Sequence, residues 1–314
     1  MESIVRLPMN KFELCYQNNQ YIMMEGAIGE RLKQDYHVDF DENVVMAGFV
    51  YDNKIRGYIK EYWTEYYNIA SMHMVPFMAT TPTRRVNSSR VNCSSFDKNI
   101  VKDNIDFLKD VRNSLGENMY VGYMLGSKGD AYTGIGCCDS DESYDFHKWE
   151  IELATLEEPD FFYAALLPSK EEALGISRCL SEYNTPYIIS FTINEDGCLI
   201  DGTPISLAIQ QIDSLVDRKP LCYMTNCVHP RIIYNSLMRN DINIIKKRFM
   251  GVQVNTADYP YIDLEYSSKI VNSTPNKIAS NVKKLDDMFD LKILGGCCGT
   301  NTIYMDKILE AVLG

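Results

Sequence analysis

The chain has 314 residues, of which 46% are hydrophobic and 24% charged, and its formal net charge at pH 7 is −12. This acidic balance argues against nucleic acid or an anionic membrane as the main partner, because both attract proteins through basic patches. A length of this order suits one large α/β domain, and since no linker, repeat or biased tract divides the chain, we expect residues 1–314 to form a single domain.

The chain is expected to be cytoplasmic. No apolar run approaches the ~18–20 residues that span a bilayer. The N-terminal sequence MESIVRLPMNKFELCYQ also lacks the basic start and the apolar stretch of a signal peptide. In a reducing compartment the ten cysteines are better explained by metal binding or catalysis than by disulfides.

Short apolar segments alternate along the chain with longer segments of helical periodicity. The predicted strands cover 21–24, 74–79, 119–124, 161–166, 187–191, 221–225, 249–254 and 291–294. The predicted helices include 98–115, 169–183, 203–218, 276–289 and 300–313. Nearly continuous apolar strands are typical of parallel strands buried on both faces. About eight strand–helix repeats predict an α/β fold, a single (β/α)8 TIM barrel with its active site at the C-terminal ends of the strands. An open doubly wound sheet is the alternative.

Cysteines stand at two of these strand ends. Cys227 follows the strand at 221–225, and Cys297 and Cys298 follow the strand at 291–294 within Gly-Gly-Cys-Cys-Gly-Thr. Neighbouring strand residues point to opposite sides, so this pair can share one ion only where the strand has ended, and the flanking glycines permit that bend. Three converging thiolates with an open fourth position make a catalytic zinc site. The alternative is three buried or loop cysteines without a metal.

These residues resemble a known family. Asn226-Cys227 followed by Gly-Gly-Cys-Cys-Gly-Thr at 295–300 resembles the homocysteine S-methyltransferase family, and the last string is highly specific to it. The segment Glu-Gly-Ala-Ile-Gly at 25–29 is similar to the Asp-Gly-x-x-Gly that follows the family's first strand. The resemblance covers nearly the whole chain and implies a (β/α)8 barrel with Zn2+ held by Cys227, Cys297 and Cys298.

The resemblance also implies a reaction. An S-methyltransferase of this family moves a methyl group from an activated donor to the thiol of homocysteine, a step of methionine biosynthesis. The implied catalytic residues are Cys227, Cys297 and Cys298. We expect the acceptor to be oriented by Glu25, Asn226 and the backbone amides of Gly26, Ala27 and Ile28. We expect the donor to meet residues that follow other strands, namely Thr81, Arg85, Asp130 and Asn255. A structural ion pair is the alternative for Arg85, and a turn-forming role is the alternative for Asp130.

The sequence departs from the family's pattern at three positions. Ala165 falls where the family has an acidic residue at the end of strand four, Glu25 replaces an aspartate, and Glu150 falls near a family glutamine. The acceptor is therefore predicted as homocysteine or a related small thiol. Two alternatives are a zinc- and thiol-binding homologue without turnover, acting as a sensor or assembly subunit, and methyl exchange with a separate corrinoid protein.

Three further features carry weaker predictions. Cys137 and Cys138 are expected in a loop over the barrel mouth, without a metal or, alternatively, as a lid or redox pair. His229 is expected to cap a helix, with support of the zinc site as the alternative. The expected partners are the thiol acceptor and the methyl donor, and a homo-oligomer is compatible with the sequence.

Overall fold

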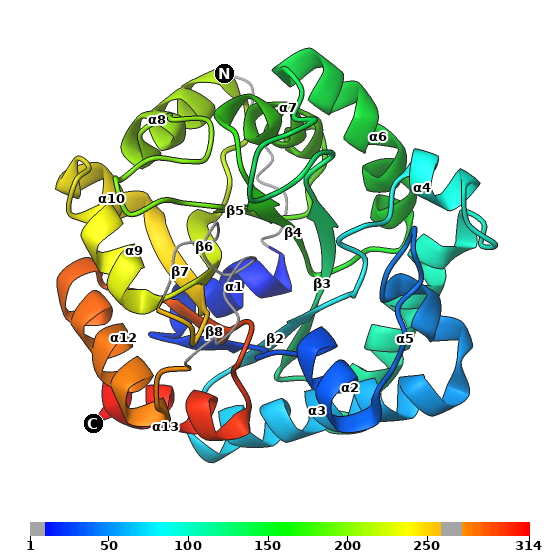
Figure 1. Cartoon of the computed structure of the whole chain (residues 1–314), viewed down its shortest axis with the longest axis horizontal. Helices are drawn as coiled ribbons and strands as arrows, with labels where there is room; N and C mark the ends of the chain where they lie inside the picture. The colour runs from blue at the N-terminus through cyan, green and yellow to red at the C-terminus, as the bar shows by residue number, and fades with distance from the viewer. Residues whose placement is uncertain (1–9, 259–271) are drawn as a thin grey trace, which may run out of the picture.

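The computed structural model describes residues 10–258 and 272–314. The N-terminal residues 1–9, with which the stretch assessed for a signal peptide begins, lie outside the described part. Eight parallel strands close into a barrel in the order β1 to β8, and β8 pairs with β1. Figure 1 shows the helices arranged around the outside of this sheet. The (β/α)8 barrel is confirmed, and the open doubly wound sheet is wrong.

The barrel strands are nearly all buried, as expected of a parallel sheet covered by helices. Every residue of β1, β2, β4, β5, β6 and β8 is buried. The strands are β1 (Ile22–Met24), β2 (Phe77–Thr80), β3 (Met119–Gly126), β4 (Phe161–Leu167), β5 (Tyr187–Phe191), β6 (Cys222–Val228), β7 (Phe249–Val254) and β8 (Ile293–Gly296).

The predicted second strand begins too early. Met74 has a positive φ of 56° and is 89% exposed, so it belongs to the turn after a helix, and pairing starts only beyond Pro76. Proline lacks the N–H that would join the ladder.

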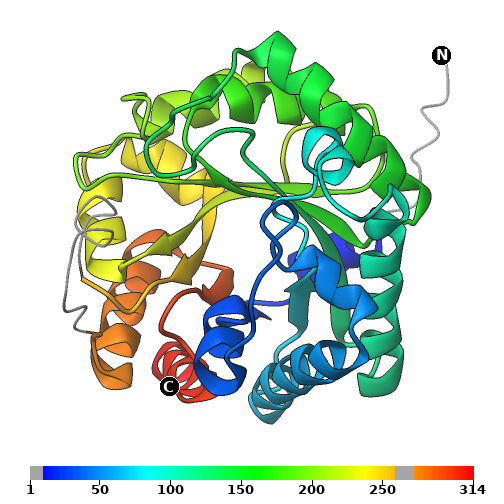
Figure 2. The same ribbon diagram turned by 45° about the vertical axis from the view of Figure 1, so that its right-hand side comes forward.

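Most helices of the described residues form the outer layer of the barrel, and Figure 2 shows this layer in the blue α3 and the green α6 and α7. They are α1 (Lys11–Asn18), α2 (Gly29–Tyr36), η1 (Ala47–Tyr51), α3 (Asn53–Met72), α4 (Ser88–Asn92), α5 (Asn99–Leu115), α6 (Ser140–Leu156), α7 (Lys170–Ser181), α8 (Ile205–Leu215), α9 (Pro230–Leu237), α10 (Ile242–Arg248), α12 (Pro275–Phe289) and α13 (Thr302–Leu313). Within the described ranges, none of them combines the length and the apolar character that crossing a membrane requires.

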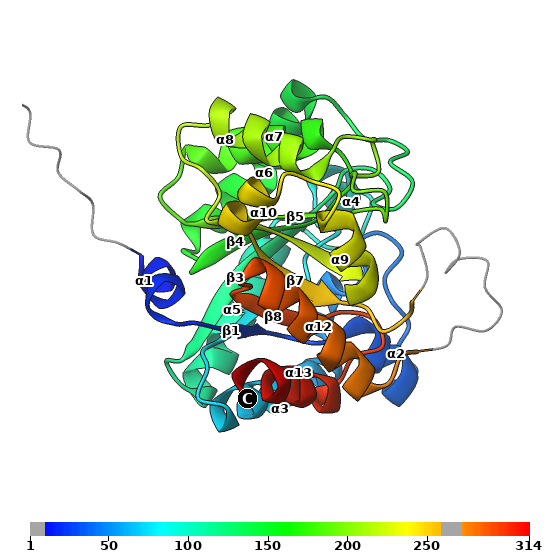
Figure 3. The ribbon, with the colours of Figure 1, turned by 90° about the vertical axis from the view of Figure 1, so that its left-hand side faces the viewer.

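The inside of the barrel is closed at one end by α1. Phe12 of α1 is fully buried and stacks on Phe161 at the start of β4, with 4.4 Å between the ring centroids. Figure 3 shows α1 at the end of the barrel where β1 begins, opposite α2. Among the described residues, α1 therefore covers the N-terminal end of the barrel, while a cavity lies at the C-terminal ends of the strands.

A charged network is buried between the helices α6 and α7. His147 of α6 is fully buried, with its Nδ1 2.7 Å from Glu150 Oε1 and its Nε2 3.3 Å from Glu172 Oε1. Burial lowers the pKa of His147, but the two carboxylates raise it more strongly, to about 9. The His147 imidazolium therefore offsets part of the free-energy cost of burying the two carboxylates.

Candidate active site

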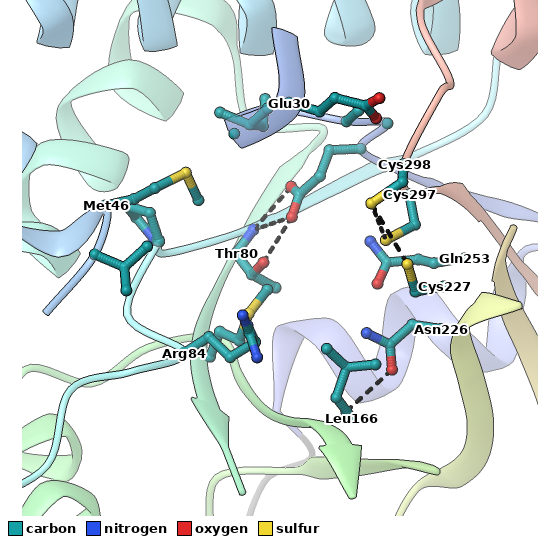
Figure 4. Close-up of a pocket in the computed structure, with 18 of the residues that line it drawn as sticks. Glu30, Met46, Thr80, Arg84, Leu166, Asn226, Cys227, Gln253, Cys297 and Cys298 are labelled. Atoms are coloured by element: carbon teal, nitrogen blue, oxygen red, sulfur yellow. Dashed lines mark hydrogen bonds between the residues drawn. The ribbon is translucent and has the colours of Figure 1, made fainter. Parts of the chain in front are cut away.

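A cavity of about 400 Å³ lies at the C-terminal ends of the strands. Every strand of the barrel except β5 supplies a lining residue from its own end or from the residue that follows it, and the loop after β3 adds Tyr132. Figure 4 shows the sulfur atoms of Cys227, Cys297 and Cys298 close together on one side of this cavity. This is the position that the fold predicts for the active site.

The three sulfur atoms belong to Cys227, Cys297 and Cys298. The Sγ atom of Cys227 lies 3.5 Å from that of Cys298, and the Sγ atoms of Cys297 and Cys298 are 4.0 Å apart. All three lie within 4.8 Å of one another. Tetrahedral zinc with Zn–S bonds of about 2.3 Å separates its sulfur ligands by about 3.8 Å. The separations therefore fit three ligands of one tetrahedral ion.

Cys227 reaches this position through a bulge in β6. The sequence pattern placed Cys227 after the strand, but the residue lies inside it. The pairing of β6 with β7 shifts register between Asn226 and Val228. Cys227, the residue between them, has a φ of 63°, which is strained for a residue with a side chain. The bulge changes the direction of one side chain while the ladder continues on either side.

Cys297 and Cys298 follow β8 in a tight turn, as predicted. The strand ends at Gly296, and Cys297 N–H still donates to Val254 O at 2.8 Å. Gly299 has a φ of 79°, and a Cβ atom there would lie 1.8 Å from Thr256 Oγ1. Only glycine fits this point, which fixes the turn and therefore both sulfur atoms.

Thr300 precedes the last helix but does not cap it. Asn301 caps α13 by accepting from Ile303 N–H and Tyr304 N–H. Thr300 Oγ1 instead accepts from Ala27 N–H at 3.1 Å and donates to Cys297 O at 2.6 Å. It therefore ties the loop after β1 to the cysteine turn.

The three thiols influence one another's ionisation. Hydrogen bonds from Cys297 and Cys298, with a further one from Tyr132, lower the pKa of Cys227 well below its usual range. Hydrogen bonding to Cys227 raises the pKa of Cys298 to about 12, and Arg84 opposes this shift. Cys227 is thus the first of the three thiols to ionise, and a cation at the centre would favour ionisation of the other two.

Beside the sulfur atoms, β4 contributes an apolar wall. The pairing of β4 with β5 shifts register between Ala164 and Leu167, and Leu166 has a positive φ of 56° and lines the cavity. Ala165 belongs instead to the apolar cluster inside the barrel. The family's acidic position is therefore filled by apolar side chains.

Asn226 connects this wall to the cysteines. Its Oδ1 accepts from Leu166 N–H at 3.1 Å and from Ser190 Oγ at 2.7 Å. One side chain therefore joins the irregular ends of β4, β5 and β6. Leu166 then packs with Cys227, Cys297 and the loop residue Tyr132.

Glu25 stands at the end of β1 and is 4% exposed. Its carboxylate accepts from Thr80 N–H at 2.9 Å and from Thr80 Oγ1 at 2.6 Å. Burial nevertheless raises its pKa to about 8, against the lowering effect of Thr80.

Most of the predicted substrate residues meet at this cavity, and two do not. The lining includes Glu25, Gly26, Ala27, Ile28, Thr81, Arg85 and Asn226. Asp130 and Asn255 are not among the described residues that line it. Asp130 accepts from the N–H groups of Tyr132 and Thr133, which agrees with the turn-forming alternative. Asn255 donates from Nδ2 to Cys227 Sγ at 3.7 Å.

Several lining residues were not expected from the sequence. Tyr132 and Leu166 depend on a loop path and on a bulge, which leave no local signal, and Gln253 looked like an ordinary strand residue. Cys137 and Cys138 lie apart from the described cavity lining, and burial raises the pKa of their thiols to about 12 and about 11. His229 caps α9, as expected.

Comparisons with known proteins agree with the fold. Residues 22–312 match the family model described as homocysteine S-methyltransferase. The structure is similar to the homocysteine methyltransferase MmuM from Escherichia coli in its metallated form, with a TM-score of 0.75 and 16% identity over 94% of this chain and 97% of that one. The oxidized form of the same protein gives a TM-score of 0.74 and 16% identity over 93% and 96% of the two chains. No curated protein sequence matches the chain.

The fold and site are therefore those of a barrel enzyme with a three-cysteine centre. The chain belongs to the homocysteine S-methyltransferase family, because the family model covers nearly all of it. The predicted family and the predicted class of enzyme, an S-methyltransferase, are both confirmed.

Proposed function

We propose that this chain is a zinc-dependent S-methyltransferase that transfers a methyl group from an activated donor to homocysteine or a related small thiol. We further propose that residues 1–314 form one barrel domain, that the enzyme works in the cytoplasm and that it supplies methionine or a related thioether. The observation that carries the proposal is the convergence of three cysteine sulfur atoms at the wall of one cavity.

The donor set favours zinc over harder cations. Thiolates are soft ligands that select zinc, copper(I) or iron–sulfur clusters, whereas magnesium and calcium prefer oxygen. Cys227, Cys297 and Cys298 would hold the ion and leave one position for a substrate, as in catalytic zinc sites. A bound zinc ion lowers the pKa of a thiol that binds to it and so supplies a thiolate nucleophile at neutral pH.

The residues around the sulfur atoms support such a transfer. Leu166 and Tyr132 pack against Cys227 and Cys297 and keep water from the reacting sulfur. In the transfer, a bond forms between the acceptor sulfur and the methyl carbon while the bond from that carbon to the donor's heteroatom breaks. We assign Glu25, Asn226 and the 26–28 loop to the acceptor, and Thr81 and Arg85 to the donor. Asp130 and Asn255 are proposed to support these loops.

The test begins with metal content. Purified protein should contain about one zinc per chain, measured by mass spectrometry of the metal, and should form methionine from homocysteine with S-methylmethionine or betaine. Each of C227S, C297S and C298S should lose most of the metal, because two thiolates bind zinc far more weakly than three. The matched control is C93S, since Cys93 is exposed and lies outside the described cavity lining.

Three results would count against the proposal. Unchanged metal content in any of the three variants would remove the centre on which it rests. Zinc binding without methyl transfer to homocysteine would contradict the homocysteine version, and thiol binding without turnover across a panel of donors would favour the homologue that binds but does not react.

A further inference from the structure

The cavity carries more positive charge than an acidic chain leads one to expect. Its lining includes the cations Lys33, Arg84 and Arg85, against the carboxylates of Glu25 and Glu30. The whole chain has a net charge of −12. In Figure 4 the side chain of Arg84 extends into the cavity. Cations gathered at a ligand cavity of an acidic protein indicate attraction of an anionic ligand.

Among the described residues, two of these cations lack a close ion pair, although the charge of Asp130 acts on Arg85. Arg84 and Arg85 are half-buried, and neither forms an ion pair with any residue of the described ranges. Arg85 has only a long contact from Nη1 to Gly129 O, at 3.5 Å. Burial lowers the pKa of Arg85, and the neighbouring charges of Arg84 and Arg90 lower it further. An anion placed between these guanidinium groups would relieve that repulsion and accept several charge-assisted hydrogen bonds.

The carboxylates of the cavity, in contrast, already have partners within the protein. Glu25 accepts from Thr80, through both its N–H and its hydroxyl. Glu30 accepts from Gly299 N–H and from Gln34 Nε2. The end of β4 offers Leu166, which is apolar. A ligand's ammonium group would therefore compete with existing hydrogen bonds for an acceptor, whereas a ligand's anionic group would meet two guanidinium groups that form no ion pair with the described residues.

The arginines also lie close to the cysteines. Arg84 lines the same cavity as Cys227, Cys297 and Cys298. An anion bound to Arg84 thus belongs to a molecule that is small enough to share one cavity of about 400 Å³ with the sulfur atoms.

We propose that Arg84 and Arg85 bind a carboxylate, sulfonate or phosphate group of a small substrate whose reacting sulfur reaches the three cysteines, and that this substrate needs no ammonium group. The inference rests on the proposed function and names the substrate class of the same site. The shared chemistry is a small anionic sulfur compound, which is either the thiol acceptor or a sulfonium donor.

The experiment measures binding rather than turnover, by titration calorimetry on the zinc-loaded protein. The thiol probes are mercaptopropionate, mercaptoethanesulfonate, uncharged mercaptoethanol, cationic cysteamine and homocysteine. On the unmodified protein we expect the two anionic thiols to bind at least about ten-fold more tightly than mercaptoethanol, with cysteamine the weakest, because each hydrogen bond from a charged group adds measurably to affinity. The donor arm compares dimethylsulfoniopropionate with trimethylsulfonium.

The variants R84Q and R85Q should each weaken binding of the anionic probes by about ten-fold or more and leave mercaptoethanol unchanged. The matched control is R90Q, because Arg90 is a nearby half-buried cation that donates to Asn43 O and lies outside the described lining. R90Q should bind all probes as the unmodified protein does.

The outcomes separate this inference from the function on which it rests. If thiols bind zinc-loaded protein with affinities that do not depend on their charge, and the two sulfonium probes also bind alike, the anion site is wrong while the thiol chemistry stands. If only the carboxylate-bearing sulfonium depends on Arg84 and Arg85, the site is supported and belongs to the donor. If no thiol binds to zinc-loaded protein, the proposed function itself fails.

Discussion

The substitution Gly299→Ala offers a sharp test of how the cysteine turn is built. A residue with a side chain at a φ of 79° costs about 1–2 kcal/mol relative to glycine. The added Cβ would also lie 1.8 Å from Thr256 Oγ1, so one of the two must move. Overpacking of this kind costs about 1–3 kcal/mol. We therefore expect the free energy of unfolding to fall by about 2–5 kcal/mol in total.

The neighbouring threonine allows the two contributions to be separated. Thr256→Ala removes the hydroxyl and its hydrogen bonds to Asn272 Oδ1 and Cys298 O, at a cost of about 1 kcal/mol. In the T256A background, G299A should retain only the backbone cost of about 1–2 kcal/mol and a smaller contact with Cβ. The two substitutions should therefore couple by about 1–3 kcal/mol in a double-mutant cycle.

The assay is urea unfolding of the four proteins of this cycle, with the metal content of each measured in parallel. G299A should bind less metal than the unmodified protein, and T256A/G299A should recover part of it, because the turn that carries Cys297 and Cys298 can relax toward its original path. A stability loss for G299A below about 0.5 kcal/mol, or one of equal size in both backgrounds, would refute the assignment of this turn.

Two further predictions concern buried ionisable groups. In H147Q, Glu150 and Glu172 lose their charged partner, and we expect a loss of about 3–5 kcal/mol near pH 6.5 by urea unfolding. The pKa of His147 is raised from 6.5 to about 9, so its stabilisation is present below pH 6.5 and the difference from H147Q should shrink as pH rises through 9; a constant difference would contradict this. The pKa of Glu25 is raised from 4.5 to about 8, so the folded state keeps a proton that the unfolded state loses, and stability falls as pH rises between these values. E25Q should flatten that fall, and an unchanged pH slope would show that Glu25 is ionised throughout.

Much of the barrel could be predicted because burial on both faces leaves a strong pattern. The predicted limits of β5 and β7 agree with the structure, since both are short runs of apolar residues bounded by polar ones. The turn after β8 was also predictable, because glycines on both sides of Cys297 and Cys298 allow a bend that strand geometry forbids.

The irregular ends of β4 and β6 could not be predicted in the same way. Leu166 and Cys227 adopt positive φ angles without being glycine, asparagine or aspartate, so local sequence preferences argue against the conformation. This backbone conformation is stabilised by the side chain of Asn226, which accepts hydrogen bonds from residues of β4 and β5. Tertiary hydrogen bonds of this kind become visible only when the barrel has closed.

The seam between β1 and β8 has a consequence for biosynthesis. Cys227 is translated before Cys297 and Cys298. The strand β1 cannot pair with its second neighbour until β8 has been translated. The backbone hydrogen bonds across this seam, such as Gly296 N–H to Glu25 O, form only after the residues up to Gly296 have been translated. A product truncated before β8 thus has neither a closed barrel nor all three cysteines, so metal loading reports on whether β8 and the cysteine turn have been synthesised.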